Sequence, residues 1–340
     1  MGSQKTISLD AMSGDLGPEV VVRAAAATLA KYVHIKLALV GDETILNKLV
    51  AQIIGDTDGD NDRLRVVHAS EVVEMSEPPV DALRKKKDSS MRVAINLVKN
   101  GEADACVSAG NTGALMATAK FVLKMLPGID RPAIIAELPA KGGSVHMLDL
   151  GANTQATADQ LFQYAVMGSI VAADIAQLER PRVALLNIGA EDIKGSDTVK
   201  EAAEVLSKST LNYVGFIEGN HLFSGKADVV VTDGFTGNVA LKTIEGAVGL
   251  TVHHLKRAFT SSWLARLQAF LAGSVLRKLA LEVDPRHYNG ATLVGLNGIV
   301  IKSHGGADAL AFQHAIDTAI VETRNQLPEQ IGSLLREEAA

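Results

Sequence analysis

The sequence predicts an open α/β fold in which helices cover a largely parallel sheet. Short apolar runs alternate along most of the chain with glycine-bearing loops and with stretches that favour helices. Apolar residues make up 47% of the 340 residues and aromatic residues only 4%, so Ala, Val, Leu and Ile fill the core. This composition is typical of a parallel sheet buried on both faces. The length suits two lobes or one large domain.

The first half of the chain predicts four strands, at residues 7–9, 35–40, 64–68 and 103–108. Helices are expected to begin at Pro18 and near Glu43, and to cover residues 115–125. The acidic segment 55–62 resembles a calcium-binding loop, but its sixth position is not glycine and its twelfth is not glutamate. We therefore expect a solvated loop there.

The second half predicts strands at residues 145–150, 182–188, 213–218 and 229–231, with shorter strands punctuated by Gly290, Gly295 and Gly298. Residues 128–133 are expected to form a connector. Helices are expected at 158–173, from about Asn238, and as one last helix that runs to about Arg336.

Glycine loops with polar side chains follow several of these strands and form the candidate site. Because the carboxyl ends of parallel strands meet at one edge of a sheet, we expect the loops to converge there. Backbone N–H groups at helix starts favour an anion, and a lysine beside them supplies the cation that a phosphate or oxyanion requires. The alternative is a set of ordinary strand-to-helix connections. The candidate residues are Asp10, Asn111, Thr112, Gly113, Asn153, Asp192, Lys194, Asp233, Gly237, Asn238 and His304.

Composition and missing motifs exclude several classes of function. A net charge of −6 argues against a general nucleic-acid binder, which needs a basic face. The single cysteine, Cys106, rules out a disulfide framework, fits a reducing cytoplasm, and is expected to be a small buried hydrophobe rather than a nucleophile. The chain shows neither a secretory leader nor an apolar run of roughly 18 residues. It also lacks the glycine-rich nucleotide fingerprints, the zinc motifs and the serine-hydrolase elbow, so we expect no metal and no bound cofactor.

A basic run, Arg84, Lys85, Lys86 and Lys87, stands out in an acidic chain. It is either the solvated face of a helix or a docking site for an acidic partner or a phosphate.

Residues 246–281 contain no acid, five lysines or arginines, and the only tryptophan. Helical spacing places Leu255, Phe259, Trp263, Leu267 and Phe270 on one face, and Gly273-Ser274 breaks the pattern before a second helix. We therefore expect a protruding amphipathic helical hairpin at 248–283 with a basic rim. Its apolar stripe would serve as a core or dimer contact, or would dock on an anionic membrane surface or in a partner's groove.

Nine segments of the chain form a further pattern when they are taken in order. They are DAMSGDLGP (10–18), KKKDSSM (85–91), SAGNTGALM (108–116), GIDRPA (128–133), LDLGAN (148–153), NIGAEDIKG (187–195), DVVVTDGFTGNVALK (228–242), and YNGA and KSHG near the C-terminus. Together they resemble the bacterial PlsX family of phosphate acyltransferases over essentially the whole chain. One departure is Ser13, where the family usually has glycine.

The resemblance implies a homodimer with the isocitrate and isopropylmalate dehydrogenase-like fold, a three-layer α/β/α sandwich. On this basis residues 1–340 form one α/β domain of two intertwined lobes, roughly 1–145 and 146–340. A fold shared with dehydrogenases does not by itself fix the function.

The implied reaction moves a long-chain acyl group from acyl carrier protein to inorganic phosphate, the first step that feeds glycerol-3-phosphate acylation in phospholipid synthesis. Phosphate is already a nucleophile and a thiolate is a tolerable leaving group, so the enzyme must mainly position the reactants and stabilise the oxyanion. Lys194 is the expected cation. Asn238 and Asn111 are the expected hydrogen-bond donors, and the backbone N–H groups of Gly113 and Gly237 complete the site.

The implied partners are acyl carrier protein, docked on Arg84 to Lys87, and the inner face of the cell membrane, reached through the hairpin. A membrane glycerol-3-phosphate acyltransferase would take the product of this cytoplasmic, peripherally bound enzyme. Three alternatives are a short-chain phosphate acyltransferase that uses coenzyme A, a non-catalytic membrane-associated scaffold, and a metal-dependent dehydrogenase of the same fold.

Overall fold

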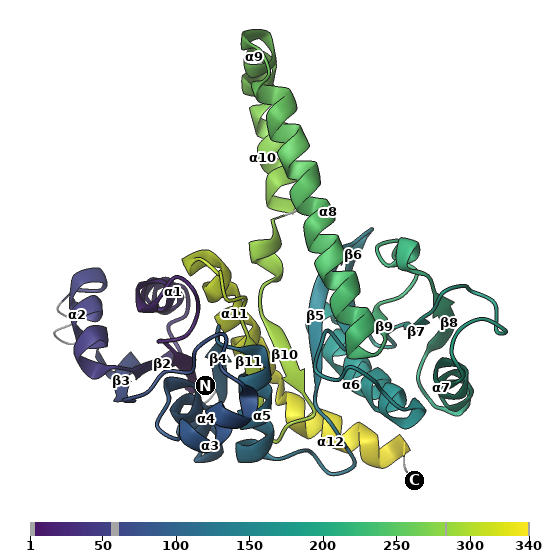
Figure 1. Cartoon of the computed structure of the whole chain (residues 1–340), viewed down its shortest axis with the longest axis horizontal. Helices are drawn as coiled ribbons and strands as arrows, with labels where there is room; N and C mark the ends of the chain where they lie inside the picture. Colours follow the sequence, from purple (N-terminus) through teal and green to yellow (C-terminus); the bar gives the residue numbers. More distant parts are fainter. Residues whose placement is uncertain (1–3, 56–60, 283, 339–340) are drawn as a thin grey trace.

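The computed structural model describes residues 4–55, 61–282 and 284–338 (Figure 1). Most of the acidic segment 55–62 and the last residue of the expected hairpin, Val283, lie outside these residues. Across the described residues, eleven strands form one sheet in the order β3-β2-β1-β4-β11-β10-β5-β6-β9-β7-β8. They are β1 Lys5–Asp10, β2 Ile35–Gly41, β3 Leu64–His68, β4 Ala105–Ser108, β5 Ala133–Ala140, β6 Gly143–Leu148, β7 Val183–Leu186, β8 Tyr213–Ile217, β9 Val229–Val231, β10 Ala291–Val294 and β11 Ile299–Lys302.

Helices follow most of the strands, as the alternating pattern predicts. Those that the structure describes are α1 Pro18–Lys31, α2 Glu43–Ile53, α3 Pro79–Lys85, α4 Ser90–Lys99, α5 Thr112–Leu123, α6 Ala158–Ala176, α7 Asp197–Lys208, α8 Gly234–Thr260, α9 Trp263–Leu271, α10 Gly273–Glu282, α11 Ala309–Asn325 and α12 Leu327–Glu338, with short 3-10 turns η1 Asn61–Arg63, η2 Gly219–His221 and η3 Pro285–Tyr288. Short polar side chains cap many of the starts: Asp42, Ser89, Asn111, Thr157, Ser196, Asp233 and Asp308 each accept a backbone N–H of the first turn.

Helices cover both faces of the sheet, which is therefore the middle of three layers (Figure 1). On one face α4, α5 and the lower part of α8 pack over Cys106, Val230 and their neighbours. On the other face α1 and α11 pack over the N-terminal strands, and α6, α7 and α12 over the C-terminal ones. Successive strand residues alternate between the two faces, as the two-residue period of a strand requires. Cys106 is fully buried and burial raises the pKa of its thiol, which confirms its expected role as a small hydrophobe.

The sheet is largely parallel, as expected, but not entirely so, because β10 pairs antiparallel with β11 and β5, and β5 pairs antiparallel with β6. Strand β5 was not expected from the sequence, and it begins at Ala133, the last residue of the expected 128–133 connector. Its turn into β6 has two glycines with positive φ, Gly142 and Gly143, so this hairpin had a signal in the sequence. Near the C-terminus, β11 and α11 return to the N-terminal strands, while the boundary of the two lobes stays a prediction.

Three helix boundaries differ from expectation because a cap begins or ends the helix. The helix expected at 115–125 begins at Thr112, behind the Asn111 cap, and the one expected from Asn238 begins at Gly234, behind Asp233. The last helix is two helices, since Gln326 adopts a left-handed conformation with φ 55° between α11 and α12.

A long arm made of the outer part of α8 with α9 and α10 protrudes from the body (Figure 1). The break in the pattern lies at Ser261-Ser262, where Ser262 caps α9, and not at Gly273-Ser274 alone. Leu255 and Phe259 therefore belong to α8, and Trp263, Leu267 and Phe270 to α9, so the expected single continuous face is wrong.

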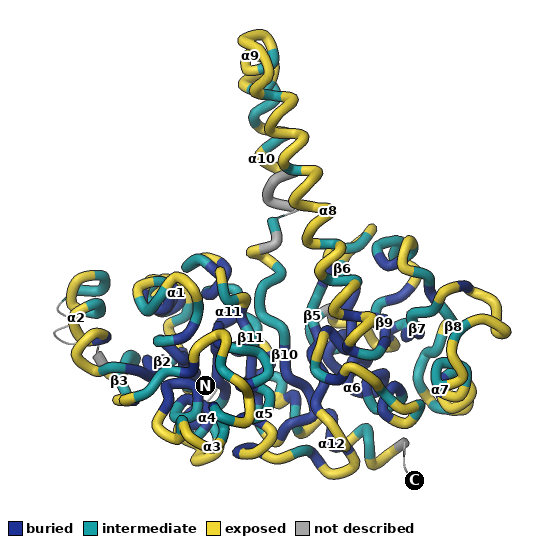
Figure 2. Tube along the Cα trace, viewed as in Figure 1, coloured by how far each residue is buried: buried dark blue, intermediate teal, exposed yellow. Residues whose placement is uncertain are grey.

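Most residues of the arm are exposed (Figure 2), and they include large apolar ones. Trp263 is 77% exposed and Phe270 is 81% exposed, so neither contacts a core within the chain. Leu255, Leu264, Leu267, Leu271 and Val275 add to the same exposed apolar surface. Among the described residues, no helix combines the length and the apolar character that crossing a bilayer requires.

Glu322, on α11, predicts how stability changes with pH. It is fully buried and accepts a 2.5 Å hydrogen bond from the Thr292 hydroxyl, and burial raises its pKa from 4.5 to about 8. Between these two pH values the native state holds a proton that the unfolded state has lost. Stability from this group is therefore fully present below pH 4.5 and is lost as the pH rises toward 8, by at most roughly 1.4 kcal/mol per pH unit.

Glu322→Gln is expected to unfold at higher urea concentration than the parent at pH 8, and at a similar concentration at pH 4. Glu329→Gln, at an exposed position of α12, is the matched control and should follow the parent at both pH values. An identical dependence on pH in the parent and in Glu322→Gln would contradict the prediction.

Candidate active site

The candidate loops lie in two sets at opposite edges of the sheet. β1, β4 and β11 run in one direction and β6, β9 and β7 in the other, because three antiparallel pairings separate them. The N-terminal loop set follows β1, β4 and β11, and the C-terminal loop set follows β6, β9 and β7. The expected convergence at a single edge is therefore wrong, since the sequence pattern does not show strand direction and β5 was missed.

The N-terminal loop set is built around Asp10, the last residue of β1. Its Oδ2 atom accepts hydrogen bonds from Ser108 at 2.6 Å and from Ser13 at 2.7 Å, while Oδ1 has no partner among the described residues. Burial raises the pKa of this carboxyl, and the hydroxyls of Ser108, Ser13 and Ser90 together with the Met12 N–H oppose the rise. Ser13 thus does more than alter the local geometry, because its hydroxyl is one of the donors to Asp10.

His304 lies in the loop after β11 and closes the same set. Asn289, in the YNGA segment, accepts a hydrogen bond from the His304 N–H at 2.9 Å and donates to Ser303 Oγ at 2.8 Å. The His304 Nδ1 atom accepts from the Gly306 N–H at 3.2 Å, and the residue is exposed. The Gly305 carbonyl accepts from the Asp15 N–H at 2.8 Å, which joins this loop to the one after β1.

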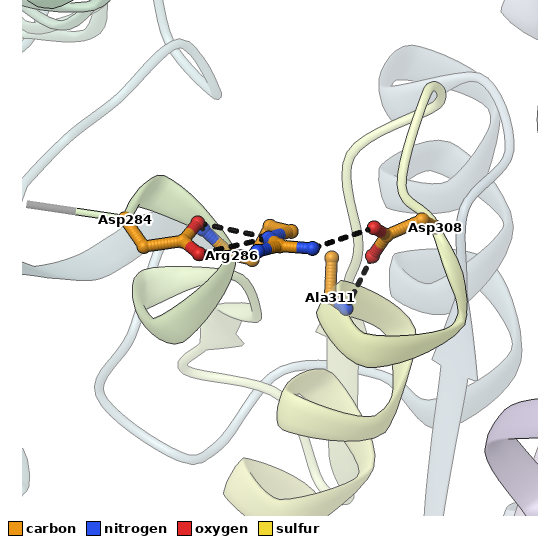
Figure 3. A network of polar contacts seen from close by, with 4 residues as sticks. All are labelled: Asp284, Arg286, Asp308 and Ala311. Atoms are coloured by element: carbon orange, nitrogen blue, oxygen red, sulfur yellow. Dashed lines mark hydrogen bonds and ion pairs between the residues drawn. The ribbon is translucent and has the colours of Figure 1, made fainter. Parts of the chain in front are cut away.

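Arg286 fixes the end of this loop to the base of the arm (Figure 3). Its guanidinium pairs with Asp284, the cap of η3, at 2.6 Å and with Asp308, the cap of α11, at 3.1 Å. The arginine holds the pKa of Asp284 below its usual range, and the Ala311 N–H together with the arginine does the same for Asp308. The segment that returns from the arm is therefore tied to the start of α11.

At the start of α5, both the oxygen and the nitrogen of the Asn111 side-chain amide make structural hydrogen bonds. Its Oδ1 accepts the Ala114 N–H at 3.0 Å, and its Nδ2 donates to the carbonyls of Met75 and Glu77. Thr112 and Gly113 are the first residues of the helix, where N–H groups lack intrahelical acceptors. A Cβ on Gly113 would lie 2.8 Å from Pro79, so the glycine lets α3 approach closely.

In the C-terminal loop set, Asp149 organises the turn after β6. Its carboxylate accepts backbone N–H groups of Ile134, Gly151, Ala152 and Asn153, at 2.7 to 3.2 Å. Asn153 Nδ2 also donates to this carboxylate and to the Tyr164 hydroxyl. Burial raises the pKa of Asp149, which these donors oppose. Asn153 is 6% exposed and is therefore a part of the scaffold of this loop.

The start of α8 packs directly against this turn. A Cβ on Gly237 would lie 1.9 Å from the Asp149 carbonyl oxygen, so only glycine fits there. The Gly237 N–H donates to the Asp233 carbonyl at 2.9 Å, because the helix has already begun at Gly234. Its expected role as a free N–H donor is therefore wrong. Asp233 caps the helix through Thr236, and its carboxylate is engaged there.

Asn238 and Lys194 present polar groups to solvent at the same edge. The Asn238 side chain is exposed, lies beside Gly151, and makes no hydrogen bond with any described residue. The Lys194 ammonium pairs with Glu191 at 2.9 Å, and this pairing raises the pKa of the lysine. Asp192 is exposed in the same loop, and its charge adds to burial in raising the pKa of Tyr213 to about 12. β7 and β9 are adjacent and parallel, so the two loops leave neighbouring strand ends.

Comparison with known proteins identifies the family. The family model for "fatty acid synthesis protein" matches residues 5–330. The chain is 56% identical over 330 residues to the phosphate acyltransferase of Nitrosococcus oceani, covering 97% of this chain and 96% of that one. It is 57% identical over 335 residues to that of Alkalilimnicola ehrlichii, covering 98% and 97%. The chain belongs to this family, the PlsX family of phosphate acyltransferases.

Solved structures show the same fold at low sequence identity. A phosphotransacetylase from Streptococcus pyogenes superposes on this acyltransferase with a TM-score of 0.64 at 20% identity, covering 96% of this chain and 95% of that one. The EutD phosphotransacetylase from Staphylococcus aureus gives a TM-score of 0.58 at 18% identity, covering 94% of each chain. These likenesses place the acyltransferase in a mixed α/β fold shared with phosphotransacetylases.

Two residues of the acyltransferase that matter for the site were missed in the sequence. Asp149 stood inside an expected strand, and only its place in LDLGAN could have drawn attention to it. Lys302 ends β11 and stood in the quoted KSHG segment, but a lone lysine after an apolar run carries no signal of burial. Its Nζ atom donates to the Ala109 carbonyl at 3.4 Å and to that of Ser303, and burial lowers its pKa to about 8.

The basic run of the acyltransferase lies at the end of α3 and in the turn before α4. Arg84 and Lys87 are exposed, Lys85 pairs with Asp81 at 3.2 Å, and Lys86 caps the helix end. The structure thus leaves several of these cations facing solvent, as either of the two sequence hypotheses requires. Among the described residues no cluster of His, Cys, Asp and Glu could hold a metal ion.

Proposed function

We propose that this chain transfers a long-chain acyl group from acyl carrier protein to inorganic phosphate and releases acyl-phosphate and the carrier thiol. The observation that carries the proposal is the near full-length match to phosphate acyltransferases within a fatty acid synthesis family. The reaction attacks a thioester carbonyl with a phosphate oxygen, so it requires an anion site and donors for the oxyanion. Lys194 and Asn238 supply a cation and an unengaged amide at one sheet edge, which supports this role.

The test is release of free thiol from palmitoyl acyl carrier protein by the purified chain, with and without inorganic phosphate. Release that requires phosphate, with palmitoyl-phosphate as product, is expected. Equal rates with acetyl-coenzyme A would favour the short-chain acyltransferase, and no release with either donor would favour a scaffold.

The long-chain preference and the peripheral membrane location rest on the arm. Its exposed Trp263 and Phe270 carry the apolar surface, and Lys256, Arg257, Arg266, Arg277 and Lys278 provide positive charge without any acid over 246–281. Such a surface suits an anionic membrane, where it would hand acyl-phosphate to a glycerol-3-phosphate acyltransferase at the inner face of the cell membrane. The enzyme would otherwise be cytoplasmic and, as the resemblance implies, a homodimer.

Trp263→Glu is expected to weaken binding to vesicles of anionic phospholipid by at least about tenfold, because it places a carboxylate where an apolar ring would enter the lipid. Co-sedimentation with the vesicles measures this. The matched control is Val33→Glu, which adds the same charge at an exposed apolar position away from the arm and should bind like the parent. Unchanged binding by Trp263→Glu would contradict membrane docking through the arm.

Acyl carrier protein would dock on the basic run Arg84 to Lys87. The exposed Arg84 and Lys87 support this assignment, since an acidic carrier would be attracted to positive side chains that the fold leaves in solvent.

A further inference from the structure

The N-terminal loop set lies at a topological switch point of the sheet. The strand order β3-β2-β1-β4 means that the chain leaves β1 on one side and later returns to its other side as β4. The helices that follow, α1 and α5, accordingly cover opposite faces. A crevice opens at the carboxyl ends of two such strands, and ligands of open α/β sheets bind there.

Three polar residues end the strands at this switch point in one row. Asp10 ends β1, Ser108 ends β4 and Lys302 ends β11, and the pairing register places Asp10 opposite Ser108 and Ser108 opposite Lys302. Residues in register share a face of the sheet. That face is the one covered by α5 and α8, because Cys106 and Val300, two positions before Ser108 and Lys302, pack there.

Lys302 is the unusual member of the row. It is partly buried, and among the described residues no carboxylate lies within ion-pair distance of its amine, which instead donates to two backbone carbonyls. The charged groups that act on it are Asp10 and Asp15 from the loop after β1 and Lys242 from α8. Burial and Lys242 lower its pKa, the two aspartates raise it, and the result is about 8.

We propose that Lys302 is the catalytic acid of the acyl transfer and gives its proton to the departing thiolate. The inference rests on the proposed function and adds a role that the C-terminal loop set does not fill. In the step, an oxygen of hydrogen phosphate forms a bond to the thioester carbonyl carbon, and the carbon–sulfur bond breaks with its electron pair on sulfur. The Lys302 ammonium transfers a proton to that sulfur, and the neutral amine recovers one from the phosphate hydroxyl. The products are acyl-phosphate and thiol, so atoms and charge balance.

The chemistry matches the residue. An acid works best when its pKa is near the working pH, and an alkyl thiol has a pKa of about 8.5, so proton transfer from this lysine is close to even. A lysine with an ordinary pKa would be a weaker acid by roughly two pKa units. α8 begins in the C-terminal loop set, and its Ala240, Leu241 and Ile244 pack in the same core cluster as Cys106 and Val300 beneath Ser108 and Lys302. This helix therefore connects the two loop sets.

The experiment compares two acyl donors that share the palmitoyl group, the pantetheine thioester and the 4-nitrothiophenol thioester. The aromatic thiol is far more acidic and leaves without a proton donor. Lys302→Met is expected to lose about a hundredfold in kcat with the pantetheine thioester and less than about tenfold with the aromatic one. Lys302→Arg keeps the charge but cannot give up its proton, so it should show the same pattern. Equal losses with both donors, or a rise in the KM for phosphate alone, would overturn the proposal.

Lys242→Met provides a readout that does not require any change at Lys302. Removing this neighbouring positive charge raises the pKa of Lys302, so the fall of kcat at alkaline pH, expected near pH 8 in the parent, should move to higher pH. An unmoved alkaline limb would count against Lys302 as the acid, even if both Lys302 variants failed to fold. Phosphate-dependent thiol release by the parent is measured first. Its absence would reject the proposed function as a whole, whereas its presence with unselective Lys302 variants would reject only this step.

Discussion

Gly237→Ala is expected to destabilise the protein by about 3 kcal/mol or more and to abolish thiol release. The added Cβ would lie 1.9 Å from the Asp149 carbonyl oxygen, which belongs to backbone and cannot turn away as a flexible side chain would. Asp149 is itself fixed by several backbone N–H groups. The start of α8 would therefore have to move away from the turn, and Asn238 with it. The midpoint of urea-induced unfolding and the rate of thiol release measure the two effects.

Gly246→Ala, on the same helix, is the matched control. Nothing lies within 4 Å of a Cβ at that exposed position, so the substitution should stabilise by up to about 1 kcal/mol through helix propensity. Similar stability changes at the two glycines would show that close packing does not decide the outcome at Gly237.

Lys194→Ala is expected to lower kcat for phosphate-dependent thiol release by about a hundredfold or more, with little change in stability. The ammonium is held only by Glu191 in an exposed loop, so its removal leaves no buried group unpaired. The loss would fall on the transition state, because a cation beside the attacking phosphate or the oxyanion counts most where charge develops.

Lys200→Ala is the control for Lys194, since Lys200 pairs with Asp197 on the surface of α7 at 3.8 Å and lies in neither loop set. Its kcat should equal that of the parent. A Lys194→Ala enzyme that turned over at the parental rate with saturating phosphate would remove this lysine from the chemistry.

Much of the fold follows from local patterns, because local physical chemistry decides where elements begin. Pro18 starts α1 as expected, and strands such as Val229–Val231 lie where the apolar runs predict them. The start of α8 expected near Asn238 lies too late in the chain, because Asp233 caps the helix and lets it begin at Gly234. Strand direction was not predictable, since it depends on which strands pair, and no local pattern reports that.

The candidate site could be predicted as a set of residues but not as an arrangement. The glycine loops drew attention to Asp10, Lys194 and Asn238, whereas in the structure Asp10 follows a strand that runs opposite to the strands before the other two. Asn111 carries the polar side chain that a substrate donor needs, but its contacts with Met75 and Glu77 come from a distant segment. Lys302 was missed for the same reason, because only tertiary packing buries its amine.

The unbroken length of α8 sets a distance as well as a direction. A helix of 27 residues spans about 40 Å, and Asn238 stands near its first turn while Thr260 ends it beside the apolar tip. If the tip docks on a membrane as proposed, the first turn of α8 would lie up to about 40 Å from the lipid, and the reaction would take place in water. Since a palmitoyl chain is shorter than this helix, the proposed acyl-phosphate would then have to leave its binding site before its tail reached the bilayer. The length of the arm would thus make the synthesis of acyl-phosphate and its transfer to the membrane two separate steps.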